Sequence, residues 1–321
     1  MFLTSPKYRV VGLLATAAIA IGACGSATVT PTPTAAPTPT PVATPVPTAT
    51  PTPIPLPTQR VVASLLPEQV VAAGQLTICS DTQNPPQEFL DSQGFPTGSD
   101  IALAHEMANR LGLKLAVVST ASSSIVAALG IGTCDIAISA QDITTATLKK
   151  VDMLPYFQAG QVFVVAKGNP SGIKTVYDLC GKAVGVRRKT AESDHLLGGG
   201  SYNPATGLSA MCLAADKKQI TVKSYASDSA AIIALEAGKL AACFTESPVA
   251  GYAVVQAPDQ LELVPDLVLN EVIEGISFAK GHDELFYAVQ AALQSMMDDG
   301  TYLQILKTYG VQADAVASTY S

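Results

Sequence analysis

Polar side chains follow a short apolar stretch at positions 135–139, where a buried strand would end. These residues carry amide, carboxyl and hydroxyl groups: Gln141, Asp142, Thr144, Thr145 and Thr147. Three other apolar stretches lead to Asp81, Arg187 and Glu246. Such groups can hold a small polar solute through hydrogen bonds and charge. Because ligands of open α/β sheets bind beyond the carboxyl ends of the strands, we expect these residues to form one ligand site.

The same residues also have ordinary structural interpretations. Asp142 or Thr144 could cap a short helix, and Arg187 could be a surface residue paired with Glu192. The histidines have no partners at catalytic spacing, so we expect them on the surface: His105, His195 and His282. The sequence contains no Ser-His-Asp set, Cys-His set or Cys-x-x-Cys pair, which argues against a nucleophilic enzyme and against a metal site.

The elements that would position these residues alternate between strands and helices. Apolar stretches predict strands over 76–80, 114–119, 135–139, 162–168, 182–188, 220–226 and 240–246. Helical spacing predicts helices over 100–113, 123–132, 173–181, 227–239, 283–300 and 301–310. This alternation indicates an α/β fold with mostly parallel sheets between helices. Residues 123–142 and 228–247 share one plan of helix, turn, strand and polar end, which suggests two similar lobes.

The first 60 residues are predicted to target and tether the protein. Residues 1–23 combine Lys7 and Arg9 with an apolar run too short to span a bilayer, as in a signal peptide. Small residues lead directly to Cys24, which we expect to carry the lipid of a lipoprotein; an ordinary signal peptide is the alternative. Residues 24–60 are rich in Pro and Thr, which favours an extended tether. We therefore predict an extracytoplasmic protein anchored to the cell membrane by the lipid on Cys24.

Residues 61–321 are sufficient for one large domain or two lobes. The 321-residue chain has a formal net charge of −7, and an acidic chain without basic clusters argues against nucleic-acid binding. Because export permits disulfides, we predict a bridge between Cys180 and Cys212, at the ends of two helix-like stretches. Cys79, Cys134 and Cys243 lie in or beside apolar strands and are expected to be buried thiols.

Four stretches of the chain resemble the bacterial extracytoplasmic solute-binding proteins that bind polar amino acids. They are "ICSDTQNPPQEFLDSQGFPTGSDIALAHEMANRLGL", "LKKVDMLPYFQAGQVFVVAKGNP", "SDSAAIIALEAGKLAACFTESPVAGY" and "DGTYLQILKTYG". The resemblance covers roughly residues 75–310. It implies the two-lobed, type II periplasmic-binding-protein-like fold, with the ligand cleft between the lobes. Lobe 1 would comprise 61–163 and 268–321, and lobe 2 would comprise 164–267.

The resemblance also relates this sequence to the family's binding site in the first lobe. In the family, an Arg five residues before the position of Asp152 grips the ligand's α-carboxylate, and here that position is Thr147. The family's aromatic residues correspond to Asn84, Gln87 and Ser122. The main carboxylate anchor and the aromatic walls are therefore absent from the sequence.

Other positions complete the implied site. Asp142 replaces a Ser or Thr that helps to bind the carboxylate, and Ala140 replaces a Gly. In lobe 2, Arg187 takes a position that often faces the ligand, and Thr190 belongs to a pair that donates to it. Glu246 replaces the Asp that pairs with the ligand's amino group. The ligand-site residues implied are Asp81, Asn84, Gln87, Ser122, Ala140, Asp142, Thr147, Arg187, Thr190 and Glu246.

The charges of this site indicate the class of ligand. Asp81, Asp142 and Glu246 supply three acids against the single base Arg187. A ligand carboxylate buried without a paired cation would cost several kcal/mol. We therefore expect a small polar solute, amino-acid-like or amine-containing, and favour a cationic amine or a neutral compound over a standard amino acid gripped by its carboxylate.

The resemblance implies the substrate-binding component of an ABC importer that delivers its solute to a permease with a cytoplasmic ATPase. We expect a monomer without a cofactor and without enzymatic activity. One alternative is a sensor that presents its ligand state to another protein. A second is an exported dehydratase-like enzyme on the same fold, and the absence of the Arg argues against it.

Overall fold

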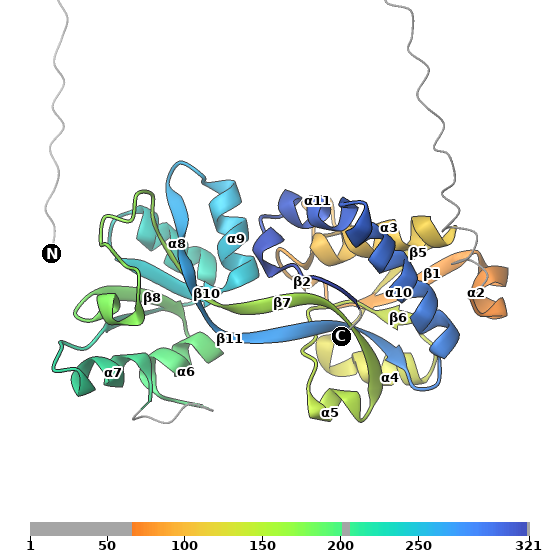
Figure 1. Ribbon diagram of the computed structural model, residues 1–321, viewed down its shortest axis with the longest axis horizontal. Helices are drawn as coiled ribbons and strands as arrows, with labels where there is room; N and C mark the ends of the chain where they lie inside the picture. Colours follow the sequence, from red (N-terminus) through yellow and green to blue (C-terminus); the bar gives the residue numbers. More distant parts are fainter. Residues whose placement is uncertain (1–65, 201–205, 320–321) are drawn as a thin grey trace, which may run out of the picture. The chain divides into compact units, whose positions relative to one another are not determined.

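The computed structural model describes residues 66–200 and 206–319, whose largest element is an eight-stranded sheet. Its strand order is β5-β1-β6-β11-β7-β10-β8-β9 (Figure 1). The strands are β1 (Gln75–Ser80), β5 (Lys114–Ser119), β6 (Ile136–Ala137), β7 (Val151–Ala166), β8 (Ala183–Arg187), β9 (Thr221–Tyr225), β10 (Ala242–Glu246) and β11 (Leu261–Ala279). A second sheet contains β2 (Gln83–Asn84), β3 (Glu88–Leu90) and β4 (Pro96–Thr97).

The long strands β7 and β11 run through both halves of the large sheet (Figure 1). They pair with each other antiparallel, and they also pair antiparallel with β10 and β6, respectively. The other pairings, β1 with β5 and β6 and β8 with β9 and β10, are parallel. We call the half that contains β5, β1 and β6 lobe 1, and the half that contains β10, β8 and β9 lobe 2. The mostly parallel, two-lobed α/β fold is confirmed, while the exact boundaries at 163/164 and 267/268 fall inside β7 and β11 and stay predictions.

Lobe 1 buries apolar side chains on both faces of its sheet. Its helices are α2 (Glu68–Ala73), α3 (Ser99–Leu111), α4 (Ile125–Gly130), α5 (Thr145–Leu148), α10 (Asp283–Asp298) and α11 (Thr301–Thr308). Leu76 and Ile78 of β1 pack in the core that contains α3, α10 and α11, whereas Cys79 packs in the cluster that contains α4. This alternation follows from the period of two in a strand. Helix α3 ends at Leu111, and Gly112 caps it with a φ of 73°, in the left-handed region.

Lobe 2 repeats this layering around β7. Its helices are α6 (Ala191–Leu197), α7 (Leu208–Ala214), α8 (Asp228–Glu236) and α9 (Ser247–Gln256). Val162 and Val164 of β7 pack in the cluster with α8, and Phe163 and Val165 pack in the cluster with α6 and α7. The helix predicted over 173–181 is only a 3-10 turn over Val176–Leu179, and α9 is an element that the sequence analysis did not predict. In lobe 1, two 3-10 turns cover Ser122–Ser124 and Gln312–Asp314.

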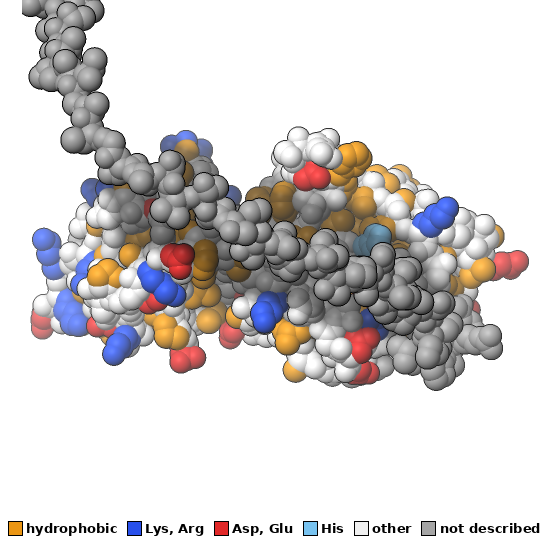
Figure 2. Space-filling model, turned by 90° about the horizontal axis from the view of Figure 1, so that it is seen from above, with side chains coloured by type: hydrophobic (Ala, Val, Ile, Leu, Met, Phe, Trp, Pro, Cys, Tyr) orange, Lys and Arg blue, Asp and Glu red, His pale blue; other side chains and the backbone are white. Residues whose placement is uncertain are grey.

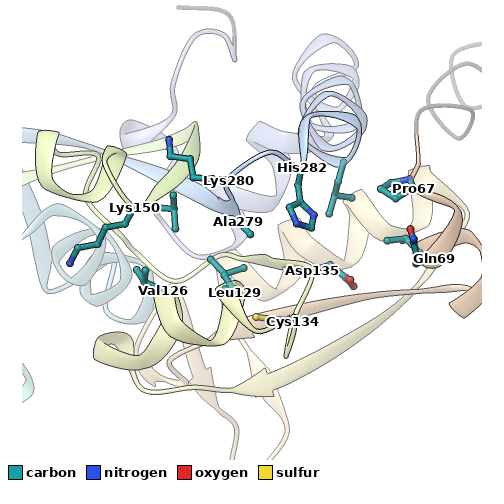
Figure 3. Close-up of a pocket in the computed structure, with 15 residues that line it drawn as sticks. Pro67, Gln69, Val126, Leu129, Cys134, Asp135, Lys150, Ala279, Lys280 and His282 are labelled. Atoms are coloured by element: carbon teal, nitrogen blue, oxygen red, sulfur yellow. The ribbon is translucent and has the colours of Figure 1, made fainter.

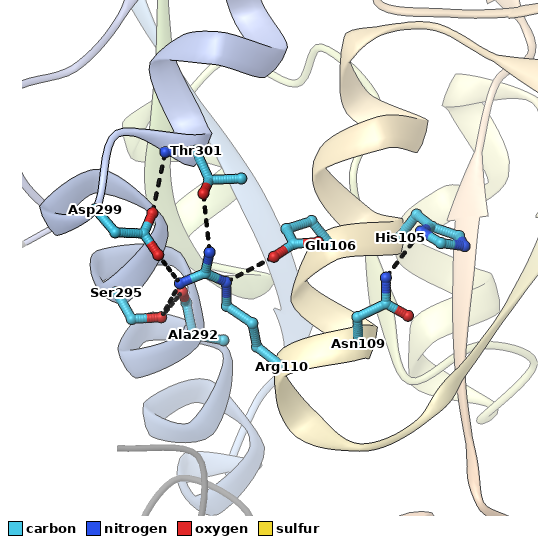
Figure 4. Close-up of polar contacts among 8 residues, drawn as sticks. All are labelled: His105, Glu106, Asn109, Arg110, Ala292, Ser295, Asp299 and Thr301. Carbon is cyan, nitrogen blue, oxygen red and sulfur yellow. Dashed lines mark hydrogen bonds and ion pairs between the residues drawn. The ribbon is translucent and has the colours of Figure 1, made fainter. Parts of the chain in front are cut away.

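Arg110 joins α3 to the C-terminal helices (Figure 4). Its guanidinium contacts Glu106 at 2.9 Å on the same helix and Asp299 at 2.8 Å in the turn before α11. It also donates to the hydroxyls of Ser295 and Thr301, each at 3.0 Å. The Arg110 side chain is only 11% exposed, so these partners replace much of the water that would otherwise hydrate its charge.

Each lobe contains one disulfide. The predicted bridge between Cys180 and Cys212 in lobe 2 is confirmed. Cys79 and Cys134 also form a bridge, so the expectation of two buried thiols was wrong for this pair. The physical reason is the parallel pairing of β1 with β6, in which Cys79 stands opposite Ala137. Cys134 lies two residues before the start of β6, so this pairing brings the two cysteines together. Cys243 is a buried thiol, as predicted.

Charged side chains of both signs are interspersed with apolar ones over the face shown in Figure 2. Across residues 66–200 and 206–319, none of the helices has the length and apolar character needed to cross a membrane. The predicted signal peptide, Cys24 and the tether lie outside the described residues.

Candidate ligand site

Asp81 and Ser122 lie together at the carboxyl ends of the lobe 1 strands. Because β1 and β6 are parallel neighbours, Asp81 and Ser139 leave the sheet at the same edge. The backbone N–H of Asp81 donates to Ser139 Oγ at 2.8 Å. Asp81 Oδ2 accepts from the backbone N–H of Ser122 at 3.0 Å. The Asp81 side chain thereby holds a fixed position while it stays only partly buried.

Two buried acids, Glu88 and Asp100, hold Asn84 and Ala140 at the same edge of the sheet. Glu88 Oε1 accepts from Asn84 Nδ2 at 2.9 Å and from Ser139 Oγ at 3.1 Å. Asp100 Oδ2 accepts from the N–H of Ala140 at 3.2 Å. Ala140 has a φ of 45°, in the left-handed region that favours glycine, which fits the glycine expected there. The acids beneath the site therefore fix the backbone of the loop after β6.

Gln87 is placed differently from the other predicted site residues. Its side chain is buried, and its amide donates to Glu274 Oε2 at 2.5 Å. Glu274 belongs to β11, and its pKa is raised above its ordinary value by burial and by the neighbouring charges of Asp100 and Asp142. The structure thus uses Gln87 to support a buried acid.

Asp142 lies between the buried acids and the turn that contains Thr147. Its backbone forms an isolated bridge with Glu274, and its carbonyl accepts from Thr147 Oγ1 at 3.1 Å. Thr144 is the N-cap of α5 and forms a capping box with Thr147. Thr147 therefore uses its hydroxyl within the turn, whereas Asp142 is an exposed residue. Partial desolvation raises the pKa of Asp142.

Arg187 is the last residue of β8 in lobe 2, and Thr190 follows it at the start of α6. Arg187 Nε contacts Asp228 Oδ2 at 3.1 Å, so its partner is Asp228 and not the suggested Glu192. Thr190 is the N-cap of α6; its Oγ1 accepts from the N–H of Ser193 and donates to the carbonyl of Arg187 at 2.9 Å. The sequence predicts a helix over 227–239, but no local pattern marks Asp228 as the partner of Arg187.

Glu246 lies at the end of β10 within a group of acids from both lobes. Although Glu246 is exposed, surrounding protein atoms partly desolvate it, and this is the main cause that raises its pKa to about 7. The charges of Glu192, Asp228 and Asp142 raise its pKa further, while that of Arg187 lowers it. Asp142 of lobe 1 and Glu246 of lobe 2 therefore belong to one electrostatic environment.

A hydrogen-bond network on the crossing strands supports this environment. The side-chain amide of Gln161, in β7, donates to the buried Glu192 at 3.0 Å. The side-chain oxygen Oε1 of Gln161 accepts from Asn270 of β11 at 2.6 Å. His195 Nδ1 lies 2.8 Å from the same oxygen. His195 is half-buried, so the surface position expected for it was wrong, and burial lowers its pKa.

A pocket of about 580 Å³ lies at the opposite end of the lobe 1 strands (Figure 3). Leu129, Val126 and Ala279 supply apolar walls, and His282 and Asp135 supply polar groups. None of the predicted ligand-site residues lines it. Within the described part of the chain, no cluster of three His, Cys, Asp or Glu residues could hold a metal ion.

Comparison with known proteins gives one consistent family. The family model described as "Bacterial extracellular solute-binding proteins, family 3" matches residues 76–312. The chain is 30% identical over 252 residues to the arginine-binding protein ArgT of Corynebacterium glutamicum, covering 78% of this chain and 79% of ArgT. It is 27% identical over 247 residues to the L-cystine-binding protein TcyJ of Escherichia coli K12, covering 77% and 86% of the two chains. The solved structure of an ancestral cationic amino acid solute-binding protein is 28% identical, with a TM-score of 0.64, and the match covers 77% of this chain and 99% of that one.

Proposed function

Because the chain belongs to the family 3 bacterial extracellular solute-binding proteins, we propose that it is the substrate-binding component of an ABC importer. Its solute would be amino-acid-like or amine-containing and would carry a cationic group. The ten predicted site residues would form the binding site between the lobes, with Gln87 acting through Glu274. The protein would act as a monomer and deliver its solute to a permease.

The observation that carries this ligand class is the excess of acids around Glu246. Its pKa of about 7 reflects partial desolvation together with three neighbouring acids. Arg187, the base in the same environment, is paired with Asp228. A bound cation would favour the ionised form of Glu246 and reduce the repulsion among these carboxylates. A bound anion would increase that repulsion.

Two of the three relatives reported above have names that agree with this charge preference, whereas TcyJ is named for L-cystine. ArgT is named for arginine, and the ancestral structure is named for cationic amino acids. The absence of an Arg at Thr147 favours a ligand whose carboxylate contributes little or is missing. Asp81 would then bind a second donor group of the solute, because its carboxylate is fixed by Ser122 and stays partly exposed.

The proposed location rests on the family and on the N-terminal sequence. Members of this family are described as extracellular. We propose that acylation of Cys24 anchors the chain to the membrane and that residues 24–60 tether the two lobes to it.

A thermal-shift and calorimetric panel tests the ligand class. Arginine and agmatine carry the same guanidinium with and without a carboxylate, and glutamate carries the opposite net charge. Each is added to the purified chain that begins after residue 60. A solute at a hundred times its dissociation constant adds about 2.7 kcal/mol to the free energy of unfolding, a shift in Tm of roughly 5–10 °C.

We expect agmatine to bind at least as tightly as arginine, and glutamate not to bind. Glu246→Gln should abolish both cation responses, whereas Lys167→Gln, at an exposed ion pair with Glu262, should leave them intact. Stabilisation by glutamate with no response to either cation would contradict the proposal.

A further inference from the structure

The pairing of Arg187 with Asp228 is built from two neighbouring strands and a helix. β8 and β10 are parallel, with Val186 opposite Phe244. Arg187 and Thr245 are the next residues of these two strands, so they lie at the same end of the sheet. Asp228 is the first residue of α8, which begins beside this end. Its Oδ2 contacts Arg187 Nε at 3.1 Å, and its Oδ1 accepts from Thr245 Oγ1 at 2.9 Å.

Asp228 is the fixed member of this pair. Its side chain is 17% exposed, whereas the Arg187 side chain is 45% exposed. Thr245 is buried and holds one carboxylate oxygen, and the first turn of a helix favours a negative charge. If Arg187 turned towards a ligand, it would leave a largely buried carboxylate without its cation, which is unfavourable. Asp228 therefore competes directly with any ligand carboxylate for Arg187.

We propose that Asp228 is a specificity-determining residue, which holds Arg187 away from a ligand's carboxylate and so sets the site to accept cationic solutes. This inference rests on the proposed function for the identity of the site. The pairing with Asp228 explains how a site can contain Arg187 and still not bind a ligand's carboxylate. Asp228 need not touch the solute; it acts by positioning Arg187.

Asp228→Asn tests the proposal because asparagine keeps an oxygen that can accept from Thr245 and removes the charge that holds Arg187. Calorimetry compares arginine, agmatine and glutamate at pH 8 in the wild type, D228N, R187Q and D228N/R187Q. In D228N, the ratio of arginine to agmatine affinity should rise by about tenfold or more, the scale of a charge-assisted hydrogen bond. R187Q should change both affinities by the same factor, and the double variant should lose the gain.

A matched control is Asp152→Asn, which makes the same substitution at the exposed ion pair with Lys280 in lobe 1. It should leave the affinity ratio unchanged. A gain of arginine or glutamate binding in D228N that disappears in D228N/R187Q supports the inference, even if the wild type binds no cation. Failure of the wild type to bind cations would instead count against the proposed function.

Two results would overturn the inference. One is a folded D228N, with a cooperative thermal transition, that gains no Arg187-dependent binding of either carboxylate ligand. The other is a selective loss of arginine over agmatine in R187Q alone, because Arg187 would then already grip the carboxylate while paired with Asp228.

Discussion

The carboxyl groups of Glu88 and Asp100 lie against each other with neither residue exposed to solvent. Glu88 Oε2 and Asp100 Oδ1 are buried atoms for which no hydrogen-bond partner is present among the described residues. A proton held between the two carboxyls gives both a partner and removes one of two buried like charges. Burial and the charge of Asp100 accordingly raise the pKa of Glu88 to about 10.

The first prediction is that this pair makes the protein less stable at alkaline pH. Glu88 keeps its proton in the folded state and loses it in the unfolded state between its ordinary pKa of 4.5 and about 10. The folded state therefore binds more protons in this window, and its free energy of unfolding falls as pH rises, by about 1.4 kcal/mol per pH unit for one proton. Glu88→Gln should make the plot of unfolding free energy against pH shallower by about one proton between pH 6 and 9. An unchanged slope in denaturant titrations would show that the pair is not protonated.

The second prediction concerns the pH dependence of binding. A cation binds better to an ionised Glu246, so affinity should rise as pH increases through its pKa of about 7. We expect agmatine to bind up to about tenfold more tightly at pH 8 than at pH 6. In Glu246→Gln, any residual agmatine binding should be flat over this range. A wild-type affinity that falls as pH rises would contradict this assignment.

The third prediction isolates the contribution of Arg110. Arg110→Gln removes two ion pairs and leaves polar groups of α10 and α11 without their donor. Loss of a partly buried charged hydrogen-bond network should lower the free energy of unfolding by about 2 kcal/mol or more. Lys167→Gln at an exposed pair with a separation of 3.6 Å is the control and should cost less than about 0.5 kcal/mol. Chemical denaturation of the two variants makes the comparison, and equal losses would argue against a role for burial.

The fourth prediction concerns the disulfide that the sequence analysis missed. The Cys79–Cys134 bridge closes 55 residues of chain, which corresponds to about 4 kcal/mol on the chain-entropy model. The Cys79→Ser, Cys134→Ser double variant should therefore have a markedly lower Tm in differential scanning fluorimetry. Peptide mapping without reductant should recover the linked pair from the wild type. Free thiols at both positions would contradict the structure.

The last prediction tests the anchor. Cys24→Ala should move the protein from the membrane fraction to the medium, because the acylated residue would be absent. Fractionation followed by intact-mass analysis measures this directly. A variant that stays membrane-bound and correctly cleaved would rule out the lipid anchor.

Local patterns predicted most of what positions the site. Apolar stretches that end in polar residues located the carboxyl ends of β1, β8 and β10, and thereby Asp81, Arg187 and Glu246. Helical spacing located α3, α10 and α11, whose apolar residues face the core of lobe 1, and α8, whose apolar residues pack in a cluster of lobe 2. These features depend on a few consecutive residues, which the sequence displays directly.

The missed features depend on contacts between distant residues. The Gln87–Glu274 hydrogen bond joins residues 187 positions apart, and the Cys79–Cys134 bridge depends on which strands are neighbours. The local sequence around Asp228 indicates only the beginning of a helix, and Asp228 is an acid in the first turn of α8. Its contact with Arg187 appears only when β8 and β10 stand side by side. The same reason hid the buried pair of Glu88 and Asp100.

The arrangement of the cysteines also suits this domain to carrying a reporter dye. Each disulfide stays within its own lobe, and Cys243 is buried with a pKa raised to about 12, so its reactive thiolate is scarce at neutral pH. In a chain that begins after Cys24, a cysteine introduced at the exposed Ser122 would be the thiol that maleimide dyes reach in the described part of the chain. Because Ser122 lies beside Asp81 of the proposed binding site, we expect the fluorescence of such a conjugate to change when a solute binds there.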